Sequence, residues 1–236
     1  MFQMNYILEG FKKGIILIFS FNEDVSVILK LSLFVSIAAT LIAIVIGVPL
    51  GSIIAIKKFP FKKIVITLTN TAMGLPPVVV GLMIALILSR NGPLGFLNWL
   101  YTAKGMILAQ VIIATPIITG LSLAAVQAVD PKFYQQILAL GANTPQALCI
   151  LIKEIRLSVL AAIIAGFGSI ISEVGAVMMV GGNIKGQTRV LTTATVLETQ
   201  MGNFDIAIAL GIILLTMSFI VNLVLTHIQQ KTPRRL

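Results

Sequence analysis

LSLFVSIAATLIAIVIGVPLGSIIAI, at residues 31–56, is an apolar stretch without a charged side chain. A helix that crosses a bilayer needs about 20 mostly apolar residues, so this stretch is long enough to span one. The rest of the chain is similar in character: 58% of its residues are hydrophobic, 11% are charged and the mean hydropathy is +1.04. One small soluble core cannot bury so much apolar surface. The sequence therefore predicts an all-α integral membrane protein that needs the lipid bilayer.

Four further stretches pass the same length test. They lie at about 64–89, 105–129, 157–180 and 206–226, so five spans are predicted. Backbone in lipid must satisfy its own hydrogen bonds, and glycine or proline inside a span is therefore expected to face protein. The expected kinks are at Pro49, at the cluster Gly74-Leu75-Pro76-Pro77 and at Pro116.

The fourth of the five stretches carries small residues at helical spacing, which let another helix approach closely. They are Ala161, Ala165, Gly168, Ser172 and Gly175 or Ala176. This face is predicted to pack inside a helix bundle.

The net charge of +9 does not indicate nucleic-acid binding, because the basic residues come in short pairs between apolar runs. Lysine and arginine accumulate in cytoplasmic loops and so report topology. Ten fall on one side of the predicted spans: Lys57, Lys58, Lys62, Lys63, Lys132, Lys153, Arg156, Lys231, Arg234 and Arg235. The other side has four, Arg90, Lys104, Lys185 and Arg189, or seven with Lys12, Lys13 and Lys30. The excess predicts a multi-pass protein of the cytoplasmic (inner) membrane, with its N-terminus outside and its C-terminus in the cytoplasm.

Residues 1–26 precede the predicted membrane domain, which covers 27–228 and is followed by a basic tail at 229–236. The apolar run from Gly14 to Phe21 is short and is followed by polar residues, so no cleavable signal peptide is predicted. The segment instead mixes aromatic and apolar residues with charged ones. An interfacial helix on the outer membrane surface is the preferred interpretation.

Several kinds of chemistry are disfavoured by composition. Cys149 is the only cysteine and His227 the only histidine, so neither a disulfide framework nor a Cys and His metal site is predicted. The chain has no GxxxxGKS/T loop to hold the phosphates of ATP. No bound cofactor, no metal and no catalytic residue are therefore expected in this chain.

The stretch VDPKFYQQILALGANTPQALCILIKEIRLS, at residues 129–158, is too polar to cross the membrane and reads as two short helices. Asp130 and Pro131 are typical of the start of the first helix, and Gly141 of the turn that ends it. Asn143 or Thr144, near Pro145, is typical of the start of the second helix. A helix–turn–helix elbow is therefore predicted in the cytoplasmic loop 130–156.

This elbow resembles the EAA loop of ABC importer permeases, in which EAA and three further residues precede a glycine, and an apolar-x-Leu-Pro element follows. Leu140, Gly141 and Ala142 match its centre. The chain departs from the pattern at Gln135, Gln136 and Ile137, in place of Glu, Ala and Ala, and at Lys153 and Glu154, in place of Leu and Pro. The resemblance implies that a partner ATPase binds at Gln135, Gln136, Leu140, Gly141, Ala142, Asn143, Thr144 and Pro145.

A longer resemblance lies at residues 171–199, ISEVGAVMMVGGNIKGQTRVLTTATVLET. This stretch is very similar to the tungstate branch of ABC importer permeases, and more distantly to molybdate and sulfate permeases. The resemblance implies a five-span type I fold like that of methionine and molybdate importers, with cytoplasmic coupling helices. It also implies a homodimer of this chain, two cytoplasmic ABC ATPase subunits that use ATP and Mg, and an extracytoplasmic substrate-binding protein.

Polar residues in or near the spans are candidates for an anion pathway. Hydroxyl and amide groups can donate hydrogen bonds to an oxyanion, although they also join packed helices: Asn70, Thr71, Thr115, Thr192, Thr193 and Thr195. Lys185 and Arg189 can attract a divalent oxyanion or a binding protein, or can lie in a solvated loop. Glu173 is the only acidic residue inside a predicted span. A structural hydrogen bond or ion pair is favoured for it, because a carboxylate on the path would repel an anion.

The predicted function is ATP-driven import of tungstate, with this chain as the non-catalytic permease subunit. Molybdate or sulfate is the alternative cargo, because tetrahedral dianions share charge and shape. An ATP-independent channel or secondary carrier would show an inverted internal repeat or several functional charges within the membrane, and the sequence shows neither. An intramembrane enzyme would need a catalytic group that Glu173 alone does not provide.

Overall fold

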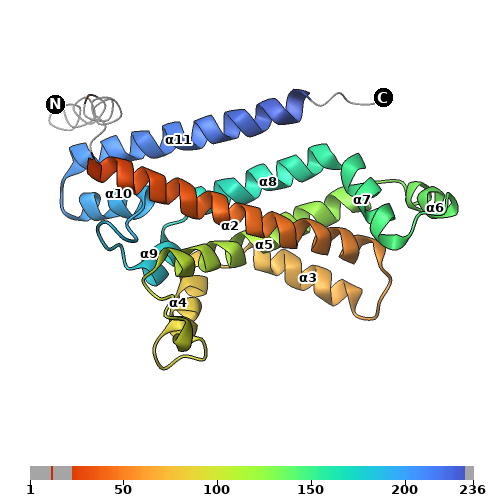
Figure 1. Cartoon of the computed structure of the whole chain (residues 1–236), viewed down its shortest axis with the longest axis horizontal. Helices are drawn as coiled ribbons and strands as arrows, with labels where there is room; N and C mark the ends of the chain where they lie inside the picture. The colour runs from red at the N-terminus through yellow and green to blue at the C-terminus, as the bar shows by residue number, and fades with distance from the viewer. Residues whose placement is uncertain (1–11, 13–22, 232–236) are drawn as a thin grey trace.

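The computed structural model describes residue 12 and residues 23–231, and within that part all regular structure is helical (Figure 1). The prediction of an all-α protein is confirmed. The elements are α2 Glu23–Ile56, α3 Lys62–Met73, α4 Pro77–Leu88, the short 3₁₀ helix η1 Gly95–Leu97, α5 Ala103–Gln127, α6 Pro131–Ala139, α7 Thr144–Glu154, α8 Arg156–Ile171, α9 Gly175–Gly181, α10 Leu191–Gln200 and α11 Phe204–Lys231. The outer interfacial helix expected in residues 1–26 falls mostly outside the described residues.

Three helices, α2, α5 and α11, are each long and apolar enough to cross a membrane. Two pairs pass the same test together but are bent, α3 and α4 by 99° and α8 and α9 by 56°. The described chain thus has up to five spans, in the order that hydropathy predicts, if each bent pair is one span. The break between α8 and α9 was not predicted.

The break in the second span lies at the cluster Gly74-Leu75-Pro76-Pro77, where a kink was predicted. Gly74 ends α3, and its amide donates to the Thr71 carbonyl at 3.1 Å. Pro76 is extended and Pro77 is the first residue of α4, a position where a missing N–H costs nothing. By contrast, α2 and α5 continue without a break through Pro49 and Pro116.

Helices α2 and α5 approach each other closely in the core. A Cβ atom built on Gly51 would lie 2.3 Å from the Thr119 carbonyl oxygen, so only glycine fits there. Gly47 lies one turn earlier and faces Ile118 in the same way. Ala39, Ala43, Gly47 and Gly51 form a buried row at four-residue spacing, a pattern that the sequence analysis missed.

Within this chain the predicted packing face of the fourth span is buried only at its α9 end, where Ala176 is fully buried and a Cβ on Gly81 of α4 would lie 2.5 Å from the Ala176 Cα atom. Ala161, Ala165 and Ser172 are exposed, and a Cβ on Gly168 would meet no atom within 4 Å.

The buried residues of α8 are instead Val159, Ala162, Gly166, Phe167, Ile170 and Ile171. Val159 and Ile170 pack in the cluster shared with α2 and α5, whereas Phe167 and Ile171 pack against α10 and α11. Gly166 permits this close packing, because a Cβ there would lie only 2.8 Å from the Ile118 side chain of α5. Close van der Waals contact is what holds helices together in lipid.

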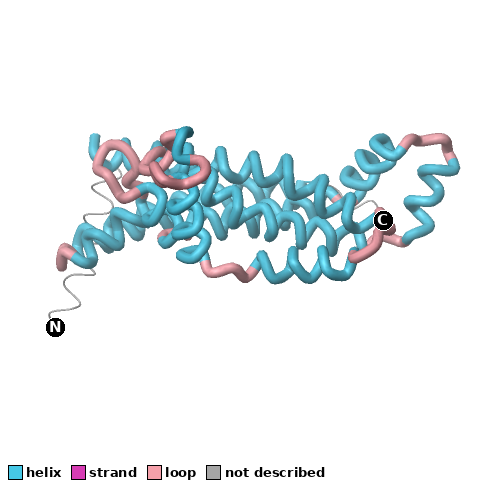
Figure 2. The backbone as a smooth tube through the Cα atoms, turned by 90° about the horizontal axis from the view of Figure 1, so that it is seen from below, coloured by secondary structure: helices cyan, strands magenta, loops and turns pink. Residues whose placement is uncertain are grey.

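The two ends of the bundle differ (Figures 1 and 2). At one end α6 and α7 project beyond the other helices, near the loop between α2 and α3 and the C-terminal end of α11. At the opposite end lie α9, α10 and the start of α2. The segments richest in lysine and arginine therefore gather at the end that carries α6 and α7, which agrees with the predicted topology. Orientation in a membrane stays a prediction.

Candidate functional site

The elbow formed by α6 and α7 has a side-chain cap at the start of each helix. The Asp130 Oδ1 atom accepts from the Lys132 amide at 2.9 Å, and Pro131 is the first residue of α6. At α7, Asn143 Oδ1 accepts from the Gln146 amide at 3.0 Å, and Gln146 Oε1 accepts from the Asn143 amide at 2.9 Å. This reciprocal pair is a capping box, which satisfies two amides that a helix start leaves unpaired. The caps expected at Asp130 and Asn143 are confirmed.

The turn between the two helices depends on Gly141, whose φ is +91°. Its amide donates to the Leu138 carbonyl at 3.0 Å, and the Ala142 amide donates to the Ile137 carbonyl at 3.3 Å. These two bonds form a Schellman motif, which ends a helix with a left-handed residue. The predicted left-handed end of the first helix is confirmed, and both ends of the corner are fixed by short-range hydrogen bonds.

The outward face of the elbow is exposed. The predicted ATPase-contact residues on it are Gln135, Gln136, Leu140, Gly141, Asn143, Thr144 and Pro145, with Ala142 half-buried. Leu140 is 88% exposed, and Ile150 is also exposed. One exposed leucine is ordinary, but two large apolar side chains on a projecting element indicate a surface that another protein covers.

The inward face anchors the elbow through α7 more than through α6. Leu151 of α7 lies in the buried core cluster shared with α2, α5 and α8. A cleft of about 540 Å³ lies between the ends of α2 and α5 and the inner side of α6, where Tyr134 and Leu138 face it. Because this space is not filled by the bundle, α6 is held mainly by the corner and by α7.

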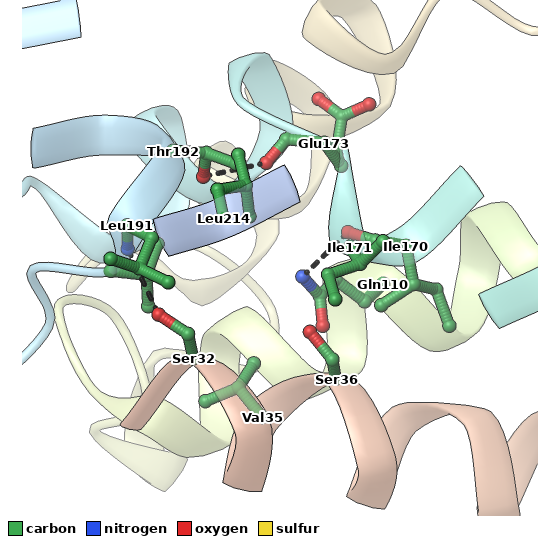
Figure 3. Close-up of a pocket in the computed structure, with 11 residues that line it drawn as sticks. Ser32, Val35, Ser36, Gln110, Ile170, Ile171, Glu173, Leu191, Thr192 and Leu214 are labelled. Atoms are coloured by element: carbon green, nitrogen blue, oxygen red, sulfur yellow. Dashed lines mark hydrogen bonds between the residues drawn. The ribbon is translucent and has the colours of Figure 1, made fainter. Parts of the chain in front are cut away.

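At the opposite end of the molecule, Glu173 lies in the break between α8 and α9 (Figure 3). Its Oε1 atom accepts from the Ala176 amide at 3.0 Å, in the first turn of α9. Its backbone carbonyl accepts from Thr192 Oγ1 at 3.1 Å. Both contacts agree with the structural hydrogen-bonding role that the sequence favoured for this carboxylate.

Next to this break is a small polar cavity that sequence reasoning missed (Figure 3). It measures about 10 Å³, roughly the space of one water molecule, and Ser36 and Gln110 line it. The Gln110 side chain donates to the Ile170 carbonyl at 3.4 Å, while its Oε1 atom has no partner among the described residues. On the same wall, Ser32 Oγ accepts from the Leu191 amide at 2.9 Å. The sequence feature that could have predicted this cavity is a set of polar side chains inside otherwise apolar spans.

The two basic residues predicted at the outer end have different surroundings. Lys185 Nζ lies 2.8 Å from Asp24 Oδ2, and both side chains are 65% exposed. Arg189 is half-buried and donates from Nη2 to the Asn183 carbonyl at 3.4 Å. Lys185 therefore links the loop before α10 to the start of α2 through an ion pair, whereas Arg189 stabilises the same loop through an internal hydrogen bond.

The predicted pathway hydroxyls mostly donate to backbone. Thr115 bonds the Val111 carbonyl at 2.6 Å, Thr71 bonds the Thr67 carbonyl at 2.9 Å, and Thr193 bonds the Val190 carbonyl at 3.1 Å. Asn70 and Thr71 are exposed on α3, while Thr192 and Thr193 are buried on α10. Within one chain, the structure does not bring these residues together into one site.

Residues 47–234 match the family described as binding-protein-dependent transport system inner membrane component. The chain belongs to this family. Membership confirms the resemblance to ABC importer permeases and establishes the chain as a membrane component of a transport system.

Curated relatives cover nearly the whole chain. It is 40% identical to the tungstate uptake system permease protein TupB of Peptoclostridium acidaminophilum, over 97% of this chain and 100% of that protein. It is 34% identical to TupB of Campylobacter jejuni, over 97% and 95% of the two chains. A probable anion ABC transporter permease protein of Haloferax volcanii is 39% identical over 88% and 92%.

A solved structure supports the fold independently of sequence. A chain of a bacterial ABC transporter involved in the import of the acidic polysaccharide alginate superposes with a TM-score of 0.79 at 19% identity, over 98% of this chain and 90% of that one. At this identity the likeness concerns the fold alone. The predicted architecture, an ABC importer permease built from helices, is thereby confirmed.

Proposed function

We propose that this chain is the permease subunit of an ATP-driven importer and that its cargo is tungstate. The observation that carries the cargo is near full-length similarity to two proteins named as tungstate uptake permeases. Molybdate and sulfate are the competing cargoes, because more distant relatives are named for them and the three dianions share a tetrahedral shape.

The projecting elbow supports a coupling role. Two cytoplasmic ABC ATPase subunits, which use ATP and Mg, would each receive one elbow, with Leu140 and the corner at Gly141 inserted into the contact. Capped helices joined by a fixed corner move as one body, so closure of the ATPases would displace the whole elbow. Because α7 reaches the core through Leu151, that displacement would pass to α2, α5 and α8.

A homodimer would explain the uncovered side of α8. Ala161 and Ala165 are exposed, and a Cβ on the half-buried Gly168 would meet no atom within 4 Å, so these small residues leave room for a helix of a second copy to approach closely. In such a dimer the pathway would run between the two chains, and Asn70 and Thr71, exposed on α3, could reach it. The scattered positions of the candidate pathway residues in one chain are compatible with a site completed by two.

The outer end would receive the anion from an extracytoplasmic binding protein. Lys185 and Arg189 would place positive charge beside the entrance, while Thr192 and Thr193 brace its wall. Glu173 would hold the break between α8 and α9 in place and remain off the path, since a carboxylate repels a dianion. This arrangement puts the start of α2 outside and the end of α11 in the cytoplasm.

The test is transport by the reconstituted complex of this chain, its ATPase and its binding protein in proteoliposomes. We expect uptake of tungstate that requires ATP, with molybdate and sulfate competing more weakly. Preferential uptake of molybdate or sulfate would refute the cargo while leaving the importer intact. Uphill uptake without the ATPase would refute the importer itself.

A further inference from the structure

Residues 57–63, which comprise the connection between α2 and α3 and the first two residues of α3, are here called the basic loop. It carries four lysines in the order KKFPFKK. Lys57, Lys58 and Lys63 are exposed, and none of them has an acidic partner within ion-pair distance among the described residues. Concentrated positive charge without a partner in the chain suits an anion from outside it.

The fourth lysine fixes the shape of the basic loop. Lys62 Nζ donates to the Ala55 carbonyl at 2.6 Å and to the Lys57 carbonyl at 3.1 Å. These bonds satisfy carbonyls at the end of α2, which a helix terminus leaves unpaired. Lys62 therefore fixes the backbone of the basic loop, and the other three lysines project from it.

Phe61 is the most unusual residue of this loop. Its φ is +63°, a left-handed conformation that is rare for a bulky side chain, and its ring is 74% exposed. Phe59 beside it is exposed as well. Strain of this kind persists where a local function repays it, and the chain itself does not cover the ring. The Phe61 ring is therefore available for contact with a partner outside this chain.

The position of the basic loop identifies the partner. Where α2 reaches the loop, it carries exposed apolar residues that include Leu50 and Ile53. Exposed apolar surface on spanning helices contacts acyl chains, so the loop lies where the hydrocarbon ends and the headgroups begin. The projecting elbow reaches further from the bundle at the same end (Figure 1).

We propose that the basic loop binds the phosphate headgroup of an anionic phospholipid. Lys58, Phe59, Phe61 and Lys63 line an open hollow of about 630 Å³ that has room for a headgroup. Lys58 and Lys63 hold the phosphate, and the Phe61 ring inserts among the upper acyl carbons. The first turn of α3 has no side-chain cap, and although the Lys62 amide donates to the Phe59 carbonyl, the next amides of this helix start add positive potential on the same side. Basic segments next to spans attract anionic lipid in this way.

The experiment measures retained lipid by native mass spectrometry on the full-length protein in mild detergent, offered phosphatidylglycerol or phosphatidylcholine. We expect the wild type to retain phosphatidylglycerol preferentially. The double variant Lys58→Gln/Lys63→Gln should retain at least about fivefold less of it, with phosphatidylcholine unchanged. The matched control, Lys132→Gln/Lys153→Gln on the elbow, removes the same charge and should retain the wild-type amount.

Phe61→Gly separates lipid binding from folding. Glycine relieves the left-handed strain, so we expect a higher melting temperature in detergent together with lower phosphatidylglycerol retention. Equal retention of the two lipids by the wild type, or equal loss in both double variants, would overturn the proposal. Weakened ATPase binding with unchanged lipid retention would overturn it in favour of a protein partner. The proposal does not depend on the cargo or on ATP coupling.

Discussion

Two bent joints, one between α6 and α7 and the other between α8 and α9, are held by different kinds of contact. The first is closed by hydrogen bonds between near neighbours, from the Schellman bonds at Gly141 to the capping box at Asn143. The second has one local side-chain bond, from the Ala176 amide to Glu173, and depends in addition on remote elements. Thr192, 19 residues away, bonds the Glu173 carbonyl, and the Tyr101 amide bonds the Val180 carbonyl at 2.9 Å.

This difference matches what each joint would do in an importer. A joint closed by its own residues keeps its shape when the helices around it move, so the α6–α7 corner can transmit a displacement. A joint held by α4 and α10 changes when those helices move, so the α8–α9 break can respond to one. Substitutions that break the local contacts of one joint or the remote contacts of the other test this difference between the two joints.

The largest effect is expected where α9 packs on α4. A Cβ on Gly81 would lie 2.5 Å from the Ala176 Cα atom, so Gly81→Val must push the two helices apart. We expect a loss of about 3 kcal/mol or more, seen as a large drop in melting temperature and in monodisperse yield. Gly211→Ala in α11 is the control, because its Cβ meets open space and should change neither measurement.

The corner of the elbow should matter for transport more than for folding. Gly141→Val forces a β-branched residue into a left-handed conformation, at a cost of roughly 1–2 kcal/mol, although its Cβ meets no neighbour. We expect uptake in proteoliposomes to fall at least about tenfold while ATP hydrolysis continues and membrane insertion is normal. Gly141→Asn, which tolerates this conformation, should keep most of the uptake. Undiminished uptake by the valine variant would contradict the coupling role.

Two substitutions of Glu173 distinguish a hydrogen-bonding role of its side chain from a role of its negative charge. Glu173→Leu removes the acceptor of the Ala176 amide and should cost about 1 kcal/mol in thermal unfolding. Glu173→Gln keeps a side-chain oxygen that can accept the same bond, so its stability and its uptake should both equal those of the wild type. If the glutamine variant is stable but does not transport, the charge itself is needed and the structural interpretation is wrong.

The smallest effect is expected at the exposed pair Asp24 and Lys185. Both side chains are largely solvated, so the coupling energy from a double-mutant cycle should be about 0.5 kcal/mol or less. It should shrink further as salt is raised. A coupling several times larger would mean that this contact secures the α9–α10 region as firmly as its buried hydrogen bonds do.

The elbow was predictable almost residue by residue, because caps and left-handed glycines act over a few positions. Asp130, Gly141 and Asn143 take the places that their types indicate. The outer end was not predictable in this way. Nothing near Ser32 in the sequence indicates that it bonds the Leu191 amide, and nothing near Gly168 indicates that its face of α8 stays uncovered.

Hydropathy and local capping in the sequence alone determined that this chain is a helical membrane protein, the approximate positions of its spans and the position of its elbow. Only the tertiary structure decided the 56° break at Glu173, the buried face of α8 and the partners of Ser32, Gln110 and Arg189. The physical reason is the distance along the sequence over which each effect acts. Hydropathy and caps depend on residues within a few turns, whereas burial and remote hydrogen bonds depend on which helices become neighbours.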